Sequence, residues 1–383
     1  MKNLKLSFLS IFFVIFIILI LAFLLADLEV RAVAPPRITA TTAAVVDVET
    51  GQVLYEKQIH LRRPPASLTK VLTAIIAIEE GNLKEKVKVS RRAAYQEGSS
   101  IYLEEGEELS LEELLYGVML ASGNDAAVAV AEHISGSVEE FARLMNKKAK
   151  EMGAKNSNFV NPSGLPHPDH YSTAYDLAMI MRQAMKNEVF ARITATKYKT
   201  ISWADNDWGR GLRNHNKLLW SYPDITGGKT GYTRAAGRCL IASAKRNSRE
   251  VIAVVLNSPN DWLEVRILLD YGLDNFKRVK VIEKGDIIHQ LEWEGSREGE
   301  ISFLAERPLT VLVPVGGKIK IRKEVYLKPE LKLPIRKGEI IGSLYLYAGE
   351  QLLGKTELIA LNDLNYNSIF LRFWHWVISL KER

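Results

Sequence analysis

The chain has 383 residues, which is enough for two domains and a large buried core. Hydrophobic residues make up 47% of it and charged residues 25%, as is ordinary for a globular protein. The net charge is +6, yet there is no long run of lysine and arginine and no nucleic-acid-binding motif, which argues against a nucleic-acid partner. The basic excess is compatible with anionic wall polymers or membrane surfaces, and equally with an unspecific solvated surface.

The N-terminal segment has the pattern of an export signal. Two lysines precede an uncharged, strongly apolar stretch at residues 6–26. Val30 and Ala32 then provide positions −3 and −1 for cleavage after Ala32, but the stretch is also long enough to span a bilayer. We therefore predict that residues 1–32 are a signal peptide or an N-terminal membrane anchor, and that the rest of the chain is exported.

Residues 33–276 are predicted to form one α+β domain. Two β-rich runs around Gly51 predict a hairpin, and a long polar loop is expected at 154–175. Helices are predicted at 67–80, 109–134, 138–152, 176–185 and about 260–275, and buried strands at 240–244 and 251–256. This order of elements indicates an antiparallel sheet covered by helices.

The C-terminal third has a different pattern. Residues 277–361 are predicted to form a small all-β domain, with period-two alternation at 319–322 and 331–333, and they contain no catalytic cluster. Residues 362–383 are predicted to contain an amphipathic helix with tryptophans on and near its apolar face. This helix is too short to span a bilayer and suits the membrane interface; packing on the protein itself or on a partner is the alternative.

Three short motifs occur in order along the first domain. They are S-x-x-K at Ser67 and Lys70, S-x-N at Ser122 and Asn124, and K-T-G at residues 229–231. Each is common by chance, but together and in fitting contexts they indicate a serine acyl-transfer site.

The contexts of the motifs are physically suitable. Ser67 opens a predicted helix, so Lys70 lies one turn further on the same face. Ser122 and Asn124 are polar residues in an apolar run, where either a functional cluster or a buried hydrogen-bond set must satisfy them. Gly231 lies in a segment predicted to begin a strand and lets a ligand approach its backbone closely.

With these motifs, the sequence resembles the serine-type D-alanyl-D-alanine carboxypeptidases, the low-molecular-weight penicillin-binding proteins. The resemblance covers nearly the whole chain, is weakest over the β domain, and extends beyond the motifs to residues 53–57, 64–70, 161–165, 170–176 and 228–233. It implies a penicillin-binding/β-lactamase-like first domain followed by the β domain and the amphipathic tail of that family.

The resemblance also implies catalytic roles. Ser67 would attack the carbonyl group between two D-alanines, because a base removes its proton. Lys70 in its neutral form would be that base, since burial and the nearby cation Lys229 lower the pKa of a lysine. Ser122 would pass the proton to the leaving amine.

The substrate-binding roles follow from the same resemblance. Asn124 would hold the substrate amide, and Lys229 and Thr230 the terminal carboxylate. Gly231 would admit the substrate, and the backbone N–H groups of Tyr232 and of the nucleophilic serine would form the oxyanion hole.

The implied function is removal of the terminal D-alanine from peptidoglycan stem pentapeptides through an acyl-enzyme that water releases, with no metal or other cofactor. The implied partners are stem peptides, β-lactam antibiotics and, through the C-terminal helix, the membrane surface. The implied location is the extracytoplasmic face of a bacterial membrane, with a role in cell-wall synthesis and remodelling.

Three alternatives stay open. A class A β-lactamase shares the motifs and fold but needs a glutamate-activated water, and residues 161–176 contain no glutamate. A β-lactam sensor or wall-binding scaffold would retain the fold without turnover. Within the family, the acyl group could pass to an amine, or cross-links could be cut, instead of the terminal D-alanine being released.

Other features carry less weight. Cys239 is the single cysteine, so it excludes an intramolecular disulfide, and its apolar neighbours predict a buried side chain. His167 and His170 lie in a Pro-rich loop without a further ligand set and are predicted to be structural. Residues 214–216 resemble a family segment near the active site, and no role is assigned to them.

Overall fold

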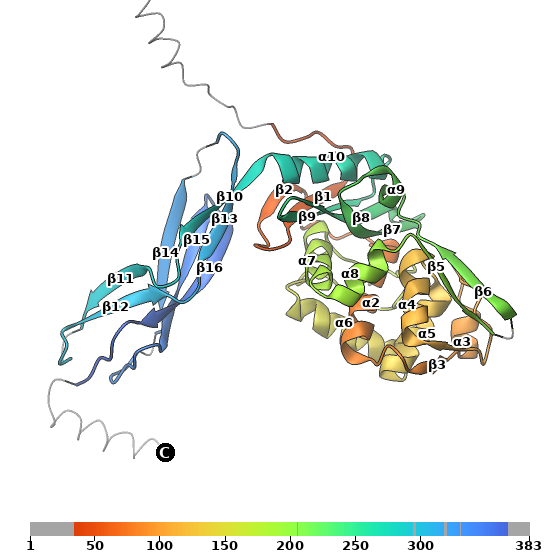
Figure 1. The fold of residues 1–383 in the computed structure, drawn as a ribbon, viewed down its shortest axis with the longest axis horizontal. Coiled ribbons are helices and arrows are strands. Elements are labelled where there is room, and N and C mark those ends of the chain that lie inside the picture. The colour runs from red at the N-terminus through yellow and green to blue at the C-terminus, as the bar shows by residue number, and fades with distance from the viewer. Residues whose placement is uncertain (1–33, 205, 294–295, 318–319, 330, 367–383) are drawn as a thin grey trace, which may run out of the picture.

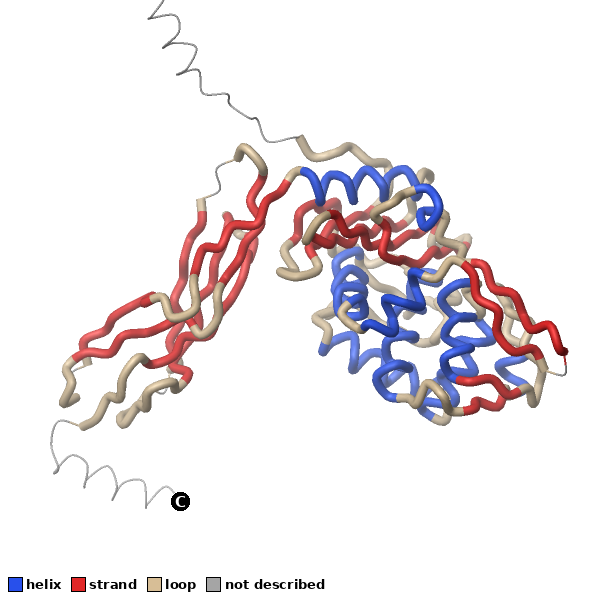
Figure 2. The backbone as a smooth tube through the Cα atoms, viewed as in Figure 1, coloured by secondary structure: helices blue, strands red, loops and turns tan. Residues whose placement is uncertain are grey.

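The computed structural model describes residues 34–366 except 205, 294–295, 318–319 and 330. The predicted export segment and most of the predicted tail helix lie outside these residues. Within the part that is described, no helix is long and apolar enough to cross a membrane. The structure consists of a sheet with helices on both faces, followed by a part built from strands (Figures 1 and 2).

The centre of the first part is a five-stranded antiparallel sheet in the order β2-β1-β9-β8-β7. Its strands are β1 Thr42–Asp47, β2 Val53–Lys57, β7 Ile225–Thr233, β8 Gly237–Arg246 and β9 Arg249–Leu256. Successive side chains point to opposite faces, so Ala44 and Val46 join one apolar core while Ala43 and Val45 join the other. Strand β7 is an edge strand, which leaves one side of its backbone available to other groups.

Helices cover both faces of this sheet (Figure 1). Helix α10, Asp261–Asp274, covers one face with Val265, Leu268 and Leu269. The other face is covered by α2 Lys70–Glu80, α4 Leu111–Leu120, α5 Asn124–Ser135, α6 Val138–Glu151, α7 Ala174–Met185 and α8 Glu188–Ala195. The predicted antiparallel sheet covered by helices is therefore confirmed.

The helix predicted at residues 109–134 is wrong. Leu109 and Ser110 lie in a short strand, and the rest of the segment forms two helices, because α4 ends where Gly123 N–H donates to Gly117 O, a bond that closes a helix C-terminus. Ser122 has a φ of 61°, and Asn124 N–H donates to Ser99 O in a separate loop. The apolar pattern continues across this break, which is why the sequence did not reveal it.

Several short or exposed elements were not predicted, and neither was α8. They are η1 Ala66–Thr69, a 3-10 turn, α3 Arg91–Ala94, α9 Leu218–Ser221, and the hairpins β3 Lys86–Lys88 with β4 Glu108–Ser110 and β5 Tyr198–Trp203 with β6 Asn206–Arg213. These segments are polar or too short for a clear period.

The second part is all β, as predicted. Strand β10 Phe276–Ile282 pairs with β13 Leu309–Pro314, and five further strands form a sheet in the order β11-β12-β16-β15-β14. Their bounds are β11 Ile287–Glu292, β12 Glu300–Ala305, β14 Ile321–Leu327, β15 Ile340–Ala348 and β16 Gln351–Ala360. Residues 331–333, predicted as a strand, are irregular and precede Pro334, although Leu331 and Leu333 pack against the core.

The first residues of the predicted tail, 362–366, are not helical and belong to the β part. Leu364 and Tyr366 form single β-bridges with Ile335 and Ser296. Residues 367–383, which carry the predicted amphipathic pattern, lie outside the described residues.

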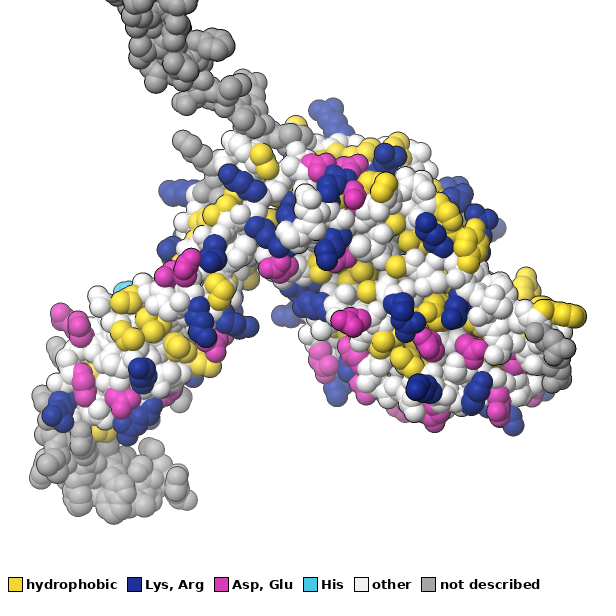
Figure 3. Space-filling view, viewed as in Figure 1, with side chains coloured by type: hydrophobic (Ala, Val, Ile, Leu, Met, Phe, Trp, Pro, Cys, Tyr) yellow, Lys and Arg dark blue, Asp and Glu magenta, His cyan; other side chains and the backbone are white. Residues whose placement is uncertain are grey.

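The turn between β1 and β2 joins the two parts. The amide of Gln52 donates from Nε2 to Leu312 O and accepts at Oε1 from Leu312 N–H, both at 2.8 Å. An ion pair between Arg278 and Glu49 adds to this contact. Basic and acidic side chains are interspersed on the face of the molecule shown in Figure 3, so on this face the described residues do not gather the positive charge into one patch.

Candidate active site

Lys70 lies at the junction of η1 and α2 with its side chain fully buried. Its Nζ atom lies 3.2 Å from Ser67 Oγ, 2.6 Å from Asn124 Oδ1 and 2.7 Å from Ser163 O. Ala66, directly before Ser67, has a φ of 48°, a left-handed conformation that is uncommon for alanine. The predicted helix therefore begins as a tight 3-10 turn, which presents Ser67 at the surface above the buried lysine.

The break between α4 and α5 brings the second motif to this lysine. Asn124 begins α5 and is itself held by a loop, with Nδ2 donating to Glu97 O at 2.7 Å. Ser122 is buried and accepts a hydrogen bond from Lys229 Nζ at 3.0 Å. A non-glycine residue in the left-handed region costs about 1 kcal/mol or more, and such residues cluster at functional sites.

The third motif lies inside β7, whereas the sequence predicted it at the start of a strand. The strand begins at Ile225 and contains an irregularity before Gly228. Lys229 is buried and donates to Thr230 O at 2.9 Å as well as to Ser122. A Cβ atom on Gly231 would lie 3.0 Å from Ser67 N and 3.2 Å from Ala66 Cβ, so glycine permits the close approach of β7 to η1.

The free edge of β7 faces the same place. Gly228 uses both its N–H and its C=O to contact Thr194 Oγ1 of α8, each at 3.0 Å, so its polar groups point away from β8. Backbone groups in a strand alternate in direction, so those of Thr230 and Tyr232 also point to the free edge. Tyr232 is 69% exposed, and its backbone N–H lies on this free edge.

Burial sets the protonation of both lysines. The pKa of Lys70 is well below its usual value, first because the side chain is buried and then because Lys229 is nearby, while Asp125 opposes the shift. Burial lowers the pKa of Lys229 to about 7. The interior therefore favours a neutral Lys70 under conditions in which an exposed lysine is charged.

The loop at residues 154–173 supports the site from behind. It contributes Ser163 O to Lys70, and His170 is buried within it. Val160 N–H donates to His170 Nδ1 at 3.2 Å, so Nε2 carries the proton and donates to Thr69 Oγ1 at 2.8 Å. Burial lowers the pKa of His170 to about 4, and the neutral ring holds the loop against η1.

Sequence reasoning missed several backbone contributors to the site. Ser163 O and Glu97 O are carbonyl oxygens, which have no sequence signature. Sequence reasoning also passed over Asp125, directly after the S-x-N motif. An aspartate within an apolar run predicts a buried carboxylate that needs hydrogen-bond donors, so the sequence did contain a signal for it. His215, to which no role was assigned, is an exposed residue. Partial desolvation of its ring and then the charge of Lys229 lower its pKa, which indicates that it lies near this lysine.

Comparison with known proteins agrees with this geometry. The sequence profile of a family described as D-alanyl-D-alanine carboxypeptidase matches residues 29–260, and a profile for the C-terminal domain of penicillin-binding protein 5 matches residues 276–366. The D-alanyl-D-alanine carboxypeptidase DacF of Bacillus subtilis is 37% identical over 334 residues, which are 85% of this chain and 86% of that protein. The chain belongs to the D-alanyl-D-alanine carboxypeptidase family.

Solved structures extend the comparison to three dimensions. Penicillin-binding protein 5 from Haemophilus influenzae has a TM-score of 0.73 and 31% identity, with 87% of this chain and 99% of that chain covered. A DD-transpeptidase from Streptomyces K15, solved as a serine-to-alanine mutant, has a TM-score of 0.59 and 31% identity, over 62% of this chain and 99% of the other. This chain therefore has the fold of penicillin-binding protein 5 in both its sheet-and-helix part and its all-β part.

The close approach of β7 to η1 generates a test. In Gly231→Ala the new Cβ meets backbone and Cβ atoms of η1, so either the strand or the turn must move away. We expect labelling of the protein by a fluorescent penicillin to slow by on the order of tenfold or more, because small misplacements at a reacting centre are costly. Gly211→Ala is the matched control, since a Cβ there meets nothing within 4 Å. Equal labelling rates for the two variants would show that the close contact between β7 and η1 is not needed for acylation.

Proposed function

We propose that this chain is a serine D-Ala-D-Ala carboxypeptidase that removes the terminal D-alanine from peptidoglycan stem pentapeptides through an acyl-enzyme on Ser67. The observation that carries the proposal is the position of the buried Lys70 amine, in contact with Ser67 Oγ and with two carbonyl oxygens. Membership of the family supports the reaction class.

The contacts of Lys70 suit a general base. A neutral amine has two N–H groups and one lone pair, whereas Asn124 Oδ1 and Ser163 O can only accept hydrogen bonds. These two oxygens therefore take the two N–H groups, and the lone pair is left facing the hydroxyl of Ser67. The contact of 3.2 Å is within the reach expected of a base and its nucleophile before the substrate binds.

In the first half of the reaction, Ser67 Oγ bonds to the carbonyl carbon of the penultimate D-alanine while its proton moves to Lys70 Nζ. The oxyanion that forms accepts hydrogen bonds from the backbone N–H groups of Ser67 and Tyr232, each worth about 3 kcal/mol. Ser122 gives its proton to the amine of the terminal D-alanine as the C–N bond breaks, and the proton taken by Lys70 replaces it.

The terminal D-alanine is held by its carboxylate. Lys229 provides a buried cation beside Ser122, and the hydroxyl of Thr230, the next residue of β7, would bind the same carboxylate. Asn124, whose Oδ1 is already engaged by Lys70, is left with an N–H for the substrate amide. In the second half, Lys70 takes a proton from water as the water attacks the ester, and Ser67 regains a proton as the C–O bond breaks.

The same serine would be acylated by β-lactams, whose strained amide presents a carbonyl to Ser67. We further propose that the protein acts outside the cell membrane during cell-wall synthesis and remodelling. The apolar stretch at residues 6–26 and the tryptophan-containing residues 368–383 support export and attachment to the membrane surface.

The nucleophile is tested by Ser67→Ala. This variant lacks the attacking oxygen, and we expect it to lose both D-alanine release from a pentapeptide muropeptide and covalent labelling by a fluorescent penicillin. Ser137→Ala, at the N-cap of α6, is the control and is expected to keep both activities, because its side chain caps that helix by accepting from Glu140 N–H and belongs to none of the three motifs. Retained labelling of Ser67→Ala, read by mass spectrometry, would assign the nucleophile to another residue.

The pH dependence follows from the two lysines. Lys70 must be neutral and Lys229 charged, so kcat/KM should rise as Lys70 loses its proton and fall as Lys229 loses its own. Because burial lowers the Lys229 pKa to about 7 in the empty site, the alkaline limb of kcat/KM should lie well below 10.5. A bound carboxylate raises that pKa, so the alkaline limb of kcat should lie at higher pH.

A substrate with an amidated C-terminus is the control for this pH profile. It presents no carboxylate to Lys229, so we expect weaker binding and the loss of the difference between the two alkaline limbs. Identical profiles for the acid and the amide substrates would contradict the role given to Lys229.

Transpeptidation by the same acyl-enzyme is a second candidate function, because a DD-transpeptidase shares the fold of the sheet-and-helix part. If an amine attacks in place of water, the product is a cross-linked peptide rather than a tetrapeptide. Incubation with a defined pentapeptide muropeptide and an added amine acceptor separates the two by product mass. Rapid turnover of penicillin would instead indicate a β-lactamase, and acylation without any D-alanine release would indicate a sensor.

A further inference from the structure

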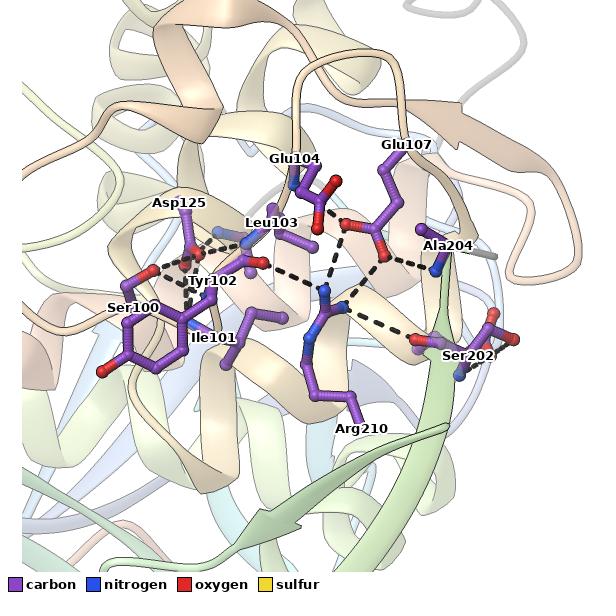
Figure 4. A network of polar contacts seen from close by, with 12 residues as sticks. Ser100, Ile101, Tyr102, Leu103, Glu104, Glu107, Asp125, Ser202, Ala204 and Arg210 are labelled. Atoms are coloured by element: carbon purple, nitrogen blue, oxygen red, sulfur yellow. Dashed lines mark hydrogen bonds and ion pairs between the residues drawn. The ribbon is translucent and has the colours of Figure 1, made fainter. Parts of the chain in front are cut away.

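Asp125 is a fully buried carboxylate whose role the reaction described above leaves open. It follows Asn124 in the first turn of α5. Its oxygens accept hydrogen bonds from Ser100 Oγ at 2.6 Å and from the N–H groups of Ile101, Leu103 and Ala126 at 3.0, 3.2 and 2.8 Å. All of these donors are neutral groups, so none of these contacts is an ion pair (Figure 4).

The loop that Asp125 binds is also the loop that holds Asn124. Asn124 donates from its backbone N–H to Ser99 O and from Nδ2 to Glu97 O, both at 2.7 Å. Between them, Gly98 has a φ of 89°, and a Cβ there would lie 2.7 Å from Asn124 Nδ2. The loop thus lies directly against Asn124, whose Oδ1 contacts Lys70. Asp125 binds the next residues of the same loop.

A second anchor holds the far end of this loop. Arg210 of β6 and Glu107 form an ion pair at 3.1 Å, with side chains only 6% and 1% exposed. Arg210 also donates to Tyr102 O at 3.0 Å, and Glu107 accepts from Ala204 N–H in the β5–β6 hairpin. Figure 4 shows these contacts on one side of the loop and those of Asp125 on the other. The loop is therefore clamped between α5 and the hairpin.

Asp125 also acts on the site through its charge. Its carboxylate raises the pKa of Lys70, against the lowering by burial and by Lys229 of β7. His170, on the loop behind η1, is a further titratable group near Lys70 and is neutral above about pH 4. Asp125 thus supplies negative charge to a lysine that otherwise faces a cation and a neutral ring.

We propose that Asp125 is a positioning residue of this site, which clamps the loop at residues 97–103 so that its carbonyl groups hold Asn124 against Lys70, and whose carboxylate interacts electrostatically with that lysine. The inference rests on the proposed function, because it assigns Asp125 to the positioning of the proposed general base.

The test is Asp125→Asn, which preserves shape but replaces one accepting oxygen by a donor and removes the charge. We expect the rate of acylation by a fluorescent penicillin to fall by on the order of tenfold, because the loop loses acceptors for its N–H groups. We also expect the acid limb of the acylation rate to move to lower pH, by up to about one unit, since Lys70 then loses its proton more easily. A purely structural role would not move this limb.

Glu264→Gln is the matched control. Glu264 is another buried carboxylate held by neutral donors, Thr39, Ala40 and Ser258, but it lies on α10. We expect this variant to be destabilised as Asp125→Asn is, and to keep both the acylation rate and its pH limb. A folded Asp125→Asn with an unchanged rate, or with a slower rate and an unmoved limb, would overturn the proposal.

Ser100→Ala keeps the test decisive if Asp125→Asn does not fold. It removes one donor to the carboxylate and keeps the charge, so acylation should slow by a few fold with the limb in place; an unchanged rate would overturn the proposal. Penicillin acylation is read separately from D-alanine release. If the unaltered protein releases no D-alanine, the proposed function fails, while these acylation rates still decide the role of Asp125.

Discussion

The Nζ atom of Lys70 is enclosed by protein, and three oxygens from different segments surround it. Burial makes its charged form costly, and the cation of Lys229 adds to that cost. Two of the three oxygens can only accept hydrogen bonds, so a neutral amine has one direction left for its lone pair, toward Ser67. The remainder of the site serves to create and maintain this environment.

Each part of the fold contributes one wall of that environment. The tight turn of η1 places Ser67 above the lysine, and the break between α4 and α5 delivers Asn124 to one side of it. The loop at residues 154–173 closes the back, where the neutral ring of His170 fastens it to Thr69. Strand β7, at the edge of the sheet, brings Lys229 and the backbone groups of its free edge to the front.

The sequence predicted the layers of the fold because its helices and strands are long and periodic. It also predicted which side chains meet around Lys70, because three spaced motifs carry them. It did not predict the break at residues 121–123, since the apolar pattern runs through it. Ser163 O and Glu97 O are backbone carbonyl groups. Every residue has such a group, so the residue type does not reveal which of them reach the site. The pair of Glu107 and Arg210 joins segments 103 residues apart in the chain, so only folding reveals it.

The protonation of Lys70 in the empty site tests this account most directly. Its side-chain resonances, followed across pH by NMR in protein with isotope-labelled lysine and assigned by comparison with Lys70→Ala, report that state without any substrate. The account predicts titration well below 10.5, the ordinary value for lysine. Titration of Lys70 at 10.5 or above would show that the amine is charged when the substrate arrives, and it would remove the base on which the proposed mechanism depends.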